Sequence, residues 1–410
     1  MRQSKLFGKT IREAPKDEVS ANAIFLSRAG YIDKLIAGVY NYLPLGVKVL
    51  SKIQNIVREE MNKIDGQEIY LSALQHKELW EKTGRWQSMK EIMFQFEGRG
   101  NQEIGLGATH EEPITSMVKK RVSSYRDLPF YLYQIQDKFR NEPRAKSGLL
   151  RGREFNMKDL YSFCESQEDL NKFYDRAIKA YLTIFERCGL KAIVTEASGG
   201  DFSKEYSHEF QVLTKNGEDN IVICTKCDFA QNSEICKLKD GDECPKCKAK
   251  VKHEKSIEVG NIFKLGTKFS HDLGLKFKDK SGKEQEVIMG SYGIGPSRVM
   301  GSVAEVYHDE KGLIWPKSLS PFAIHLLLLS EDDKKKQIAD KLYDDLIKQG
   351  IDILYDDREV SAGVKLNDAD LIGVSLQLII GDKTKDKVEY KIRAGNKKGE
   401  VDEKDIKKLL

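Results

Sequence analysis

Two pairs of cysteines place the strongest constraint on how this chain can fold. Cys224 and Cys227 form one Cys-x2-Cys pair, and Cys244 and Cys247 form a second pair after an interval of sixteen residues. This spacing is typical of a zinc site in which two tight turns each present two thiolates to one tetrahedral ion. The surrounding segment, 219–255, is polar and rich in lysine, so it has no apolar core that would bury four unrelated thiols. The spacing therefore predicts a small structural zinc module.

The remaining cysteines and the apolar runs indicate a cytoplasmic protein. The chain has seven cysteines, and an odd number argues against a framework of disulfides. Residues 1–5 are not followed by an apolar stretch of signal-peptide length. The longest apolar run, Phe322–Leu329, is interrupted by His325 and is too short to span a bilayer. We therefore expect no membrane association.

Length and charge restrict the remaining possibilities. A chain of 410 residues is too long for one ordinary domain and suggests two or three. Its 68 basic and 64 acidic residues leave a net charge of only +4, which by itself hardly favours nucleic acid as a partner. Any inference of RNA binding must therefore depend on where particular charges lie.

The chain up to about residue 316 predicts an α+β domain with an antiparallel sheet. Apolar residues at three- and four-residue steps from Val47 to Ile64, just after Pro44, predict a helix, and the same pattern predicts another over Gln167–Cys188. Strands are expected at Gln67–Leu74, Glu91–Phe96, Glu103–Leu106, Phe130–Phe139, Arg153–Phe163, Ile257–Phe269 and Gln285–Met289.

After Trp315-Pro316 the pattern becomes a short alternation of strands and helices, which predicts a small α/β domain with parallel pairings. Strands are expected at Ala323–Leu329, Ile351–Tyr355, Leu376–Ile380 and Val388–Ile392, and helices at Lys334–Gln349 and Gly363–Ile372. The predicted division is a core of residues 1–218 and 256–316, a Cys-rich insertion of residues 219–255, and a C-terminal domain of residues 317–410.

The segment 134–163 carries the densest set of residues capable of chemistry. Two strand-like runs joined by a basic loop predict an antiparallel pair with a positive tip. An arginine in such a strand, Arg140, is costly to desolvate unless it meets an anion, and its planar fork suits phosphate or carboxylate oxygens. A surface ion pair with Glu142 or Glu154 is an alternative that this stretch alone leaves open.

Three motifs in order resemble those of class II aminoacyl-tRNA synthetases. Arg140-x-Glu142, a loop and then Arg151-x3-Phe155 resemble motif 2. Gly293–Arg298, ahead of an apolar helix, resembles motif 3, and Gly38–Pro44, ahead of a long helix, resembles motif 1. More specifically, the chain is similar over nearly its whole length to bacterial prolyl-tRNA synthetases, and this likeness includes the segments Leu106–Glu112, Val259–Lys268 and Asp356–Gly373.

The resemblance implies a class II catalytic domain with an antiparallel sheet and a C-terminal α/β anticodon-binding domain. The implied reaction is the ATP-dependent attachment of L-proline to tRNA(Pro) through a prolyl-adenylate, with ATP and Mg²⁺ as cofactors. The motif 1 helix packs across a two-fold axis in this family, so the resemblance also implies a homodimer.

The resemblance further implies a role for each nucleotide-site residue. Arg140 would bridge the carboxylate of proline and the α-phosphate, and Glu142 would accept a hydrogen bond from the adenine amino group. Phe155 would stack under the adenine ring, although a core aromatic is the alternative for this residue alone. Arg151 and Arg298 would hold the β- and γ-phosphates, and Thr267 would reach the nucleotide.

The proline pocket implied by the resemblance has two parts. Thr109 and Glu111 would accept the two N–H groups of the secondary ammonium, and Met157, Asp159 and Phe269 would line the ring. For these three lining residues a purely structural role is an open alternative. Because the nucleophile is already ionised, no general base is required, so His110 and His208 are interpreted as structural.

Two departures from the family pattern carry expectations. Many bacterial prolyl enzymes have a large editing domain between motifs 2 and 3, whereas only the Cys segment stands there in this chain. We therefore expect no hydrolysis of alanyl-tRNA in cis, which leaves that task to a separate hydrolase acting in trans. Ser291 also stands in motif 3 where the family often has cysteine.

Three alternatives stay open at this point. A class II synthetase of another specificity, threonyl being nearest, would place zinc ligands in the amino-acid pocket. A non-catalytic synthetase-like protein that binds RNA or regulates would have lost its arginines, whereas Arg140, Arg151 and Arg298 are all present. The zinc module could also contact tRNA through its lysines, Lys237, Lys239, Lys246, Lys248, Lys250 and Lys252, although a run of charge is usually a solvated face.

Overall fold

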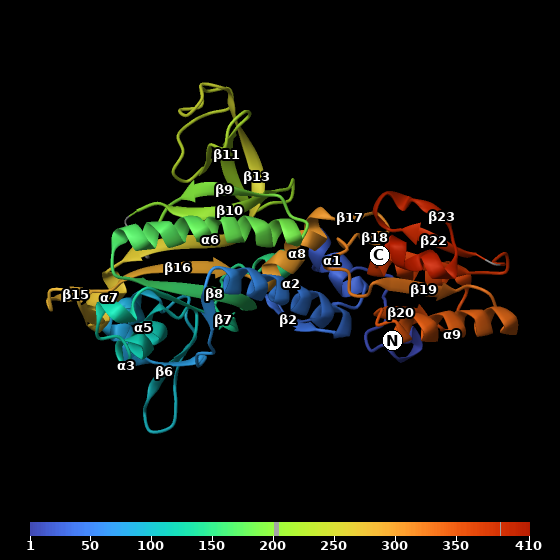
Figure 1. The fold of residues 1–410 in the computed structure, drawn as a ribbon, viewed down its shortest axis with the longest axis horizontal. Coiled ribbons are helices and arrows are strands. Elements are labelled where there is room, and N and C mark those ends of the chain that lie inside the picture. Colours follow the sequence, from blue (N-terminus) through green and yellow to red (C-terminus); the bar gives the residue numbers. More distant parts are fainter. Residues whose placement is uncertain (201–204, 386) are drawn as a thin grey trace. The chain divides into compact units, whose positions relative to one another are not determined.

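The computed structural model of the chain describes residues 1–200, 205–385 and 387–410 (Figure 1). These residues form two units, one of residues 1–36, 40–53 and 303–410 and the other of residues 37–39 and 54–302. No helix within the described ranges is both long enough and apolar enough to cross a membrane.

The larger unit, residues 37–39 and 54–302, is built on a mainly antiparallel sheet. Its described strands lie in the order β10 (Ser207–Leu213), β9 (Ala192–Ala197), β12 (Ala230–Asn232), β11 (Asp219–Cys224), β13 (Val251–Gly266), β16 (Ile288–Ile294), β8 (Glu154–Cys164), β7 (Phe130–Phe139) and β3 (Gly66–Glu68). Among the described strands of this sheet, only the pairings β3–β7 and β9–β12 are parallel. The antiparallel sheet expected for the core is therefore confirmed.

Near one edge of this sheet lies the antiparallel pair of β7 and β8, which the sequence predicts. Its register pairs Phe130 with Phe163 and Phe139 with Glu154. Since side chains alternate between the two faces of a strand, Phe155, Met157, Asp159 and Tyr161 of β8 share one face. β16 pairs with the other side of β8 and brings motif 3 beside it.

A long amphipathic helix, α6 (Gln167–Arg187), lies across one face of the sheet (Figure 1). Ser166 caps its first turn by accepting a hydrogen bond from the backbone N–H of Asp169 at 3.2 Å. The apolar positions that predicted this helix are all buried: Leu170, Phe173, Tyr174, Ala177, Tyr181, Ile184 and Phe185. The ring of Phe173 stacks on Tyr131 of β7 with centroids 3.6 Å apart, which fixes the helix on the strands below it.

A smaller sheet in the order β4 (Leu74–His76), β6 (Glu103–Leu106) and β5 (Gln95–Glu97) belongs to the same unit. It is accompanied by α3 (Lys77–Lys82), α4 (Arg85–Ser88) and α5 (Glu111–Lys119). The strand expected over Glu91–Phe96 is wrong in extent, because the chain turns until β5 begins. Met93 is buried with Trp80 and Trp86 instead of continuing a strand.

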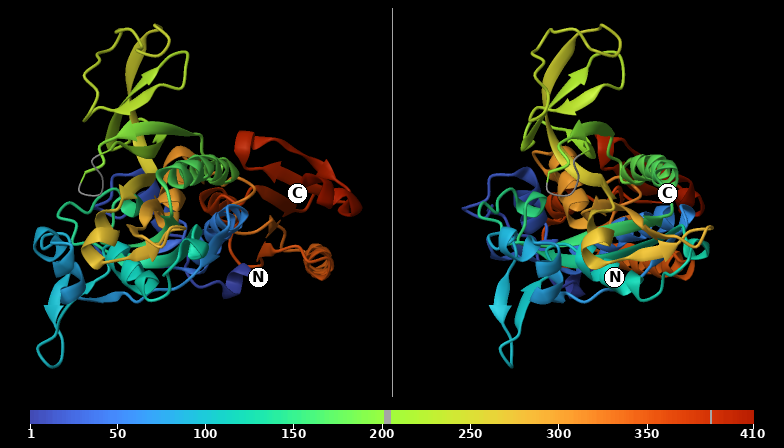
Figure 2. Two further views of the ribbon diagram at one scale, coloured as in Figure 1. Left: turned by 60° about the vertical axis from the view of Figure 1, so that its left-hand side comes forward. Right: turned by 90° about the vertical axis from the view of Figure 1, so that its left-hand side faces the viewer.

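The cysteine-bearing segment is continuous with the large sheet. β11 pairs with both β12 and β13, and β13 runs from the cysteine segment into the centre of the sheet. The boundary expected between residues 255 and 256 therefore falls inside one strand. Figure 2 shows the segment projecting away from the rest of the sheet. This unit also contains α7 (Lys268–Leu273), β14 (Lys276–Lys278), β15 (Glu284–Glu286) and the start of α8 (Pro296–Val306).

The other unit contains the predicted α/β domain. Its sheet has the order β20 (Ile353–Asp356), β19 (Ile324–Leu328), β21 (Leu376–Ile380), β22 (Val388–Ile392) and β23 (Lys398–Val401), together with α9 (Asp333–Lys348) and α10 (Ala362–Ile372). β19 pairs in parallel with β20 and β21, as expected. The unit also holds α1 (Ala21–Arg28), β1 (Ile32–Ile36), β17 (His308–Asp309) and β18 (Gly312–Leu313).

The helix expected after Pro44 is α2 (Pro44–Lys63), preceded by β2 (Val39–Tyr42). Ile53, Val57 and Met61 are fully buried, as the pattern predicts. Val47, however, is 48% exposed. In this part of the helix the buried face is formed by Leu45 and Val49, and Val47 lies off that face. The N-terminal part of α2 therefore presents an apolar side chain to solvent.

Candidate active site

A cavity of about 410 Å³ lies in the larger unit, on the face of β8 that carries Phe155, Met157, Asp159 and Tyr161. It gathers most of the residues singled out in the sequence: Thr109, Glu111, Arg140, Glu142, Arg151, Phe155, Met157, Asp159 and Arg298. Ser291, Gly293 and Gly295 of the motif 3 strand and Glu258 of β13 also line it. Residues separated by up to 189 positions thus meet in one site.

Arg140 lies directly after β7. Its Nε donates a hydrogen bond to the carbonyl oxygen of Ala108 at 3.2 Å, and its guanidinium carbon lies 5.2 Å from the centre of the Phe155 ring. Burial, followed by the nearby charge of Arg298, lowers the pKa of Arg140. Arg140 and Arg298 face the same cavity, and two guanidinium groups so placed define a site suited to anions.

The two other arginines of the site are each held by a carboxylate. Arg151 pairs with Glu142 at 3.0 Å and with Glu218 at 4.0 Å. Arg298 pairs with Glu258 at 2.9 Å, and its Nε donates to the carbonyl oxygen of Leu150 at 2.9 Å. These ion pairs keep both arginines oriented in the cavity.

Glu218 and Glu258 were not singled out in the sequence. Glu258 interrupts the apolar part of a predicted strand, and a charged residue there is a signal that could have marked it. Glu218 lies in a polar segment, where its charge carries no such signal. Its role as a partner of Arg151 depends on a contact across 67 positions of the chain, which no local pattern reveals.

Thr109 and Glu111 form a hydrogen-bonded pair at another part of the cavity. The Thr109 hydroxyl donates to Glu111 Oε2, and the Ser291 hydroxyl donates to Glu111 Oε1 at 3.1 Å. Glu111 is nearly inaccessible to solvent, at the start of α5. A buried carboxylate that already accepts two hydroxyl groups is a strong acceptor for an ammonium ion.

Asp159 is surrounded by donors. Lys138 Nζ lies 2.8 Å from Oδ1, and the Gln134 side-chain amide and the Tyr161 hydroxyl donate to Oδ2 at 2.9 and 3.0 Å. Burial alone would raise the pKa of Asp159, but Lys138 more than offsets this effect and the pKa is lowered. Asp159 is therefore an ionised carboxylate with a buried cation of its own.

His110 lies behind this cavity rather than in its lining. Lys138 Nζ donates to His110 Nδ1 at 2.8 Å, and His110 Nε2 donates to the carbonyl oxygen of Ser72 at 3.1 Å. Burial and the charge of Lys138 lower the pKa of His110 to about 4, so the imidazole is neutral at pH 7. These contacts agree with the structural role expected from the sequence.

Two predicted site residues are not brought to the cavity. Thr267 immediately precedes α7, and Phe269 is completely buried in the core cluster that includes Ile114 and Leu265. β13 ends at Gly266, whose φ of +61° turns the chain into α7 and directs Phe269 into the core. Phe269 was expected to line the pocket for the proline ring. It lies instead in the hydrophobic core next to the cavity.

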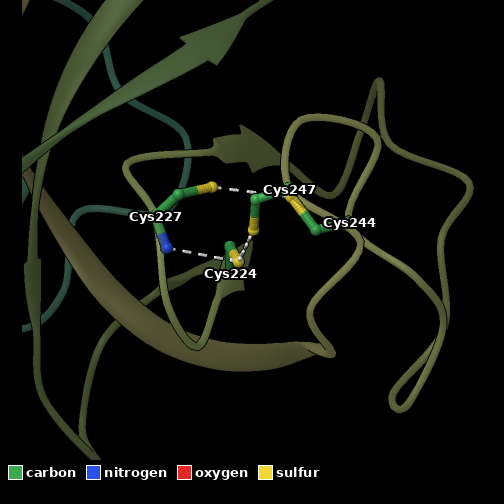
Figure 3. Close-up of side chains that lie close together, drawn as sticks. All are labelled: Cys224, Cys227, Cys244 and Cys247. Carbon is green, nitrogen blue, oxygen red and sulfur yellow. Dashed lines mark hydrogen bonds between the residues drawn. The ribbon is translucent and has the colours of Figure 1, made fainter.

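The four cysteines of the predicted zinc module lie close together in space (Figure 3). All four sulfur atoms lie within 4.8 Å of one another, with 3.5 Å between those of Cys224 and Cys247 and 3.6 Å between those of Cys227 and Cys244. Tetrahedral zinc with Zn–S bonds of about 2.3 Å needs sulfur separations of about 3.8 Å, so the donor set fits the ion. None of the four is among the residues described as lining the active-site cavity.

The chain matches two known families. Residues 94–307 match the tRNA synthetase class II core domain (G, H, P, S and T), and residues 323–410 match the anticodon binding domain. Together with the antiparallel sheet and with motifs 2 and 3 around one cavity, these matches define a class II aminoacyl-tRNA synthetase.

Comparison with full-length relatives identifies the family within this class. A proline–tRNA ligase of Halothermothrix orenii is 33% identical over 100% of this chain and 99% of its own length, and one of Sulfurihydrogenibium sp. is 35% identical over 98% of each. The chain belongs to the proline–tRNA ligase family. The first alignment extends over 564 positions although this chain has 410 residues, so that relative has a long segment with no counterpart here.

Solved structures support the fold. A prolyl-tRNA synthetase from Cryptosporidium parvum, complexed with halofuginone and AMPPNP, superimposes with a TM-score of 0.77 at 17% identity and covers 95% of this chain and 73% of its own. A prolyl-tRNA synthetase from Giardia lamblia, in complex with prolyl-adenylate, has a TM-score of 0.77 at 20% identity and covers 94% of this chain and 75% of its own.

Proposed function

We propose that the chain attaches L-proline to tRNA(Pro) with ATP, through a prolyl-adenylate. The observation that carries this proposal is a single cavity with three anion-binding arginines and a buried Thr109–Glu111 acceptor pair. The arginines suit the phosphates of ATP and the carboxylate of the amino acid, and the acceptor pair suits its ammonium. The full-length likeness to proline–tRNA ligases supports proline as that amino acid.

The activation step needs positioning rather than proton transfer. A carboxylate oxygen of proline attacks the α-phosphorus of ATP, and the bond from that phosphorus to the bridging oxygen of pyrophosphate breaks. Arg140 is placed to hold both anions, which would otherwise repel each other as they approach. The rate enhancement then comes from orientation and from stabilisation of the negative charge on the phosphate oxygens.

The other nucleotide contacts follow from the lining of the cavity. Glu142 would accept from the adenine amino group, and Phe155 would stack on the ring. Arg151 and Arg298 would exchange their carboxylate partners for the β- and γ-phosphates. Thr267 is kept as a nucleotide contact only on the basis of the family resemblance, since it does not line the cavity.

Mg²⁺ is proposed as the companion of ATP. Glu218, Asp219 and Glu258 line the cavity together with Arg151 and Arg298, and carboxylate oxygens are the donors that Mg²⁺ prefers. The ion would neutralise part of the charge on the phosphates. Asp219 and Glu258 are the residues that we propose to hold it.

The proline subsite would be formed by Thr109 and Glu111 around the ammonium and by Met157 and Asp159 around the ring. Phe269 would support this subsite from the core. Because Lys138 already neutralises Asp159, Glu111 is the carboxylate we assign to the ammonium.

The C-terminal α/β domain is proposed to bind the anticodon of tRNA(Pro). Arg358 lies 2.7 Å from Asp356 and 2.9 Å from Asp368, and this network leaves no basis for assigning base contacts to these three residues. We further propose that the enzyme is a homodimer in the cytoplasm. The exposed apolar side chains of Leu35, Ile36 and Val47, near motif 1, support a surface that a second copy covers.

The module of residues 219–255 is proposed to hold a structural zinc ion through Cys224, Cys227, Cys244 and Cys247. Four thiolates would complete the tetrahedron and leave no position open for catalysis. The lysines of this module include two with acidic partners, Lys246 with Asp228 and Lys252 with Glu254, which supports a solvated face rather than a tRNA-binding surface.

The long segment of the first relative that has no counterpart here, which we propose to be the editing domain expected between motifs 2 and 3, leads to a prediction about fidelity. Purified enzyme should form prolyl-tRNA(Pro), and when it is offered alanine it should accumulate alanyl-tRNA(Pro), because a pocket for proline cannot strongly exclude a smaller side chain. Acid gels of labelled tRNA would measure both products over time. Failure to form prolyl-tRNA would contradict the proposed function, whereas rapid clearance of alanyl-tRNA without an added hydrolase would reveal an editing site in this chain.

A further inference from the structure

Three carboxylates lie buried at the part of the cavity assigned to the ammonium of proline: Glu111, Glu112 and Asp159. Two cations, Arg85 and Lys138, are buried beside them. Glu111 and Asp159 line the cavity, whereas Glu112, Arg85 and Lys138 lie behind it. Burying so many charges is costly unless they are matched, so their pairing has to be considered as a set.

The pairing is unequal. Lys138 lies 2.8 Å from Asp159. Arg85 Nη1 donates to both oxygens of Glu112, at 2.9 and 3.1 Å, and lies 3.7 Å from Glu111 Oε2. The Thr83 hydroxyl completes the shell of Glu112 at 2.9 Å. Each cation therefore has one preferred carboxylate, and Glu111 is the carboxylate with the weakest cation contact in the described set.

The position of Arg85 is fixed by its surroundings. Its guanidinium carbon lies 5.0 Å from the Trp80 ring and 5.4 Å from the Phe269 ring. Trp80 in turn donates to Gln75 at 2.8 Å, and Gln75 donates to the carbonyl oxygen of Thr109 at 3.0 Å. The strand β4 and the helices α3 and α4 thus orient both Arg85 and the segment that carries Thr109 and Glu111.

We propose that Arg85 is a positioning residue for proline binding: by holding Glu112 through two hydrogen bonds it leaves Glu111 available to the substrate's secondary ammonium. This inference rests on the proposed assignment of the ammonium to Glu111. Without Arg85, Glu112 loses the cation that holds it in place beside Glu111, and Glu111 is less well placed to bind the ammonium. Without the charge of Glu112, Arg85 turns to Glu111, 3.7 Å away, and competes with the ammonium.

The proposal predicts that each single variant weakens proline binding, one by removing a positive charge and the other by removing a negative charge. It also predicts that the double variant restores proline binding. Arg85→Met and Glu112→Gln should each raise the KM for proline about tenfold in pyrophosphate exchange, with the KM for ATP unchanged at saturating proline. The double variant Arg85→Met/Glu112→Gln removes one charge of each sign and should bring the KM for proline most of the way back. Arg85→Lys, which keeps the charge, should stay closest to the unmodified enzyme.

A matched control is Arg176→Met, which breaks a surface pair with Asp65 on the same unit and should leave the KM for proline unchanged. Two results would show that the Arg85–Glu112 pair only supports the fold. One is a KM for proline in the double variant as high as in the worse single variant, and the other is a rise in the KM for ATP equal to the rise in the KM for proline. If Arg85→Met does not fold, Glu112→Gln decides alone, because a freed Arg85 must still raise the KM for proline.

The variant Glu111→Gln tests the assignment of the ammonium to Glu111 separately from the role of Arg85. A rise of about 100-fold in the KM for proline, combined with no rescue in the Arg85/Glu112 double variant, would overturn only the role of Arg85. A KM for proline unchanged by Glu111→Gln would overturn the assignment of the ammonium site itself.

Discussion

Replacing Arg140 with alanine should lower the rate of proline-dependent pyrophosphate exchange by about 10³-fold, which corresponds to about 4 kcal/mol of lost transition-state stabilisation. In the proposed reaction Arg140 contacts both the attacking carboxylate and the α-phosphate, so its loss would leave two anions facing each other in the cavity. The expected change is in kcat and in kcat/KM together. Stopped exchange reactions with labelled pyrophosphate would measure both.

The fold should survive this change. The side-chain hydrogen bond lost in Arg140→Ala is the one to the Ala108 carbonyl, worth about 1 kcal/mol, so thermal unfolding should shift by only a few degrees. Arg140→Lys keeps the charge but loses the planar fork and should recover only part of the activity. Near-normal exchange by a folded Arg140→Ala enzyme would remove the role assigned to this residue.

Replacing Cys244 with serine should release the zinc ion and unfold the module around it. Cys244 is completely buried among the other three cysteines, and the free energy of zinc binding in comparable small modules is about 10–16 kcal/mol. The unmodified protein should carry about one zinc ion per chain by elemental analysis. In Cys244→Ser, hydrogen exchange should become fast in peptides from residues 224–250 while α6 stays protected.

Cys236→Ser provides the matched control. Cys236 packs against the same cluster, but its sulfur is not one of the four that gather, so this variant should keep its zinc. Equal zinc content in Cys244→Ser and in the unmodified protein would contradict the proposed site, as would a protein purified without chelators that contains no zinc.

Local pattern and the family resemblance together predicted much of the site. The pattern gave the two strands of the 134–163 segment and the resemblance gave the roles of Phe155, Met157 and Asp159, which alternation along β8 places on one face. The cysteine spacing likewise predicted a cluster that the structure brings together. The α/β order after residue 316 was readable because short apolar runs alternate with longer polar segments of helical length.

Long-range pairing could not be predicted in the same way. Two ion pairs depend on contacts between separate segments: Lys138 with Asp159, and Arg85 with Glu112. A buried lysine or arginine leaves no periodic signal in the sequence that would reveal its partner. Phe269 was misplaced for a local reason, since the left-handed turn at Gly266 ends β13 three residues earlier than the apolar run suggested. The same difficulty applies to Val47, where an apolar residue in register with a buried stripe is exposed.

The most direct test of the central claim is pyrophosphate exchange measured with each proteinogenic amino acid in turn, at equal concentration and with ATP and Mg²⁺. Proline should support rapid exchange, alanine a much slower reaction, and the other amino acids none above background. Faster exchange with another amino acid, such as threonine, would contradict the specificity assigned to the Thr109–Glu111 pocket. If no amino acid supports exchange, the claim that the chain is an amino-acid-activating enzyme is contradicted.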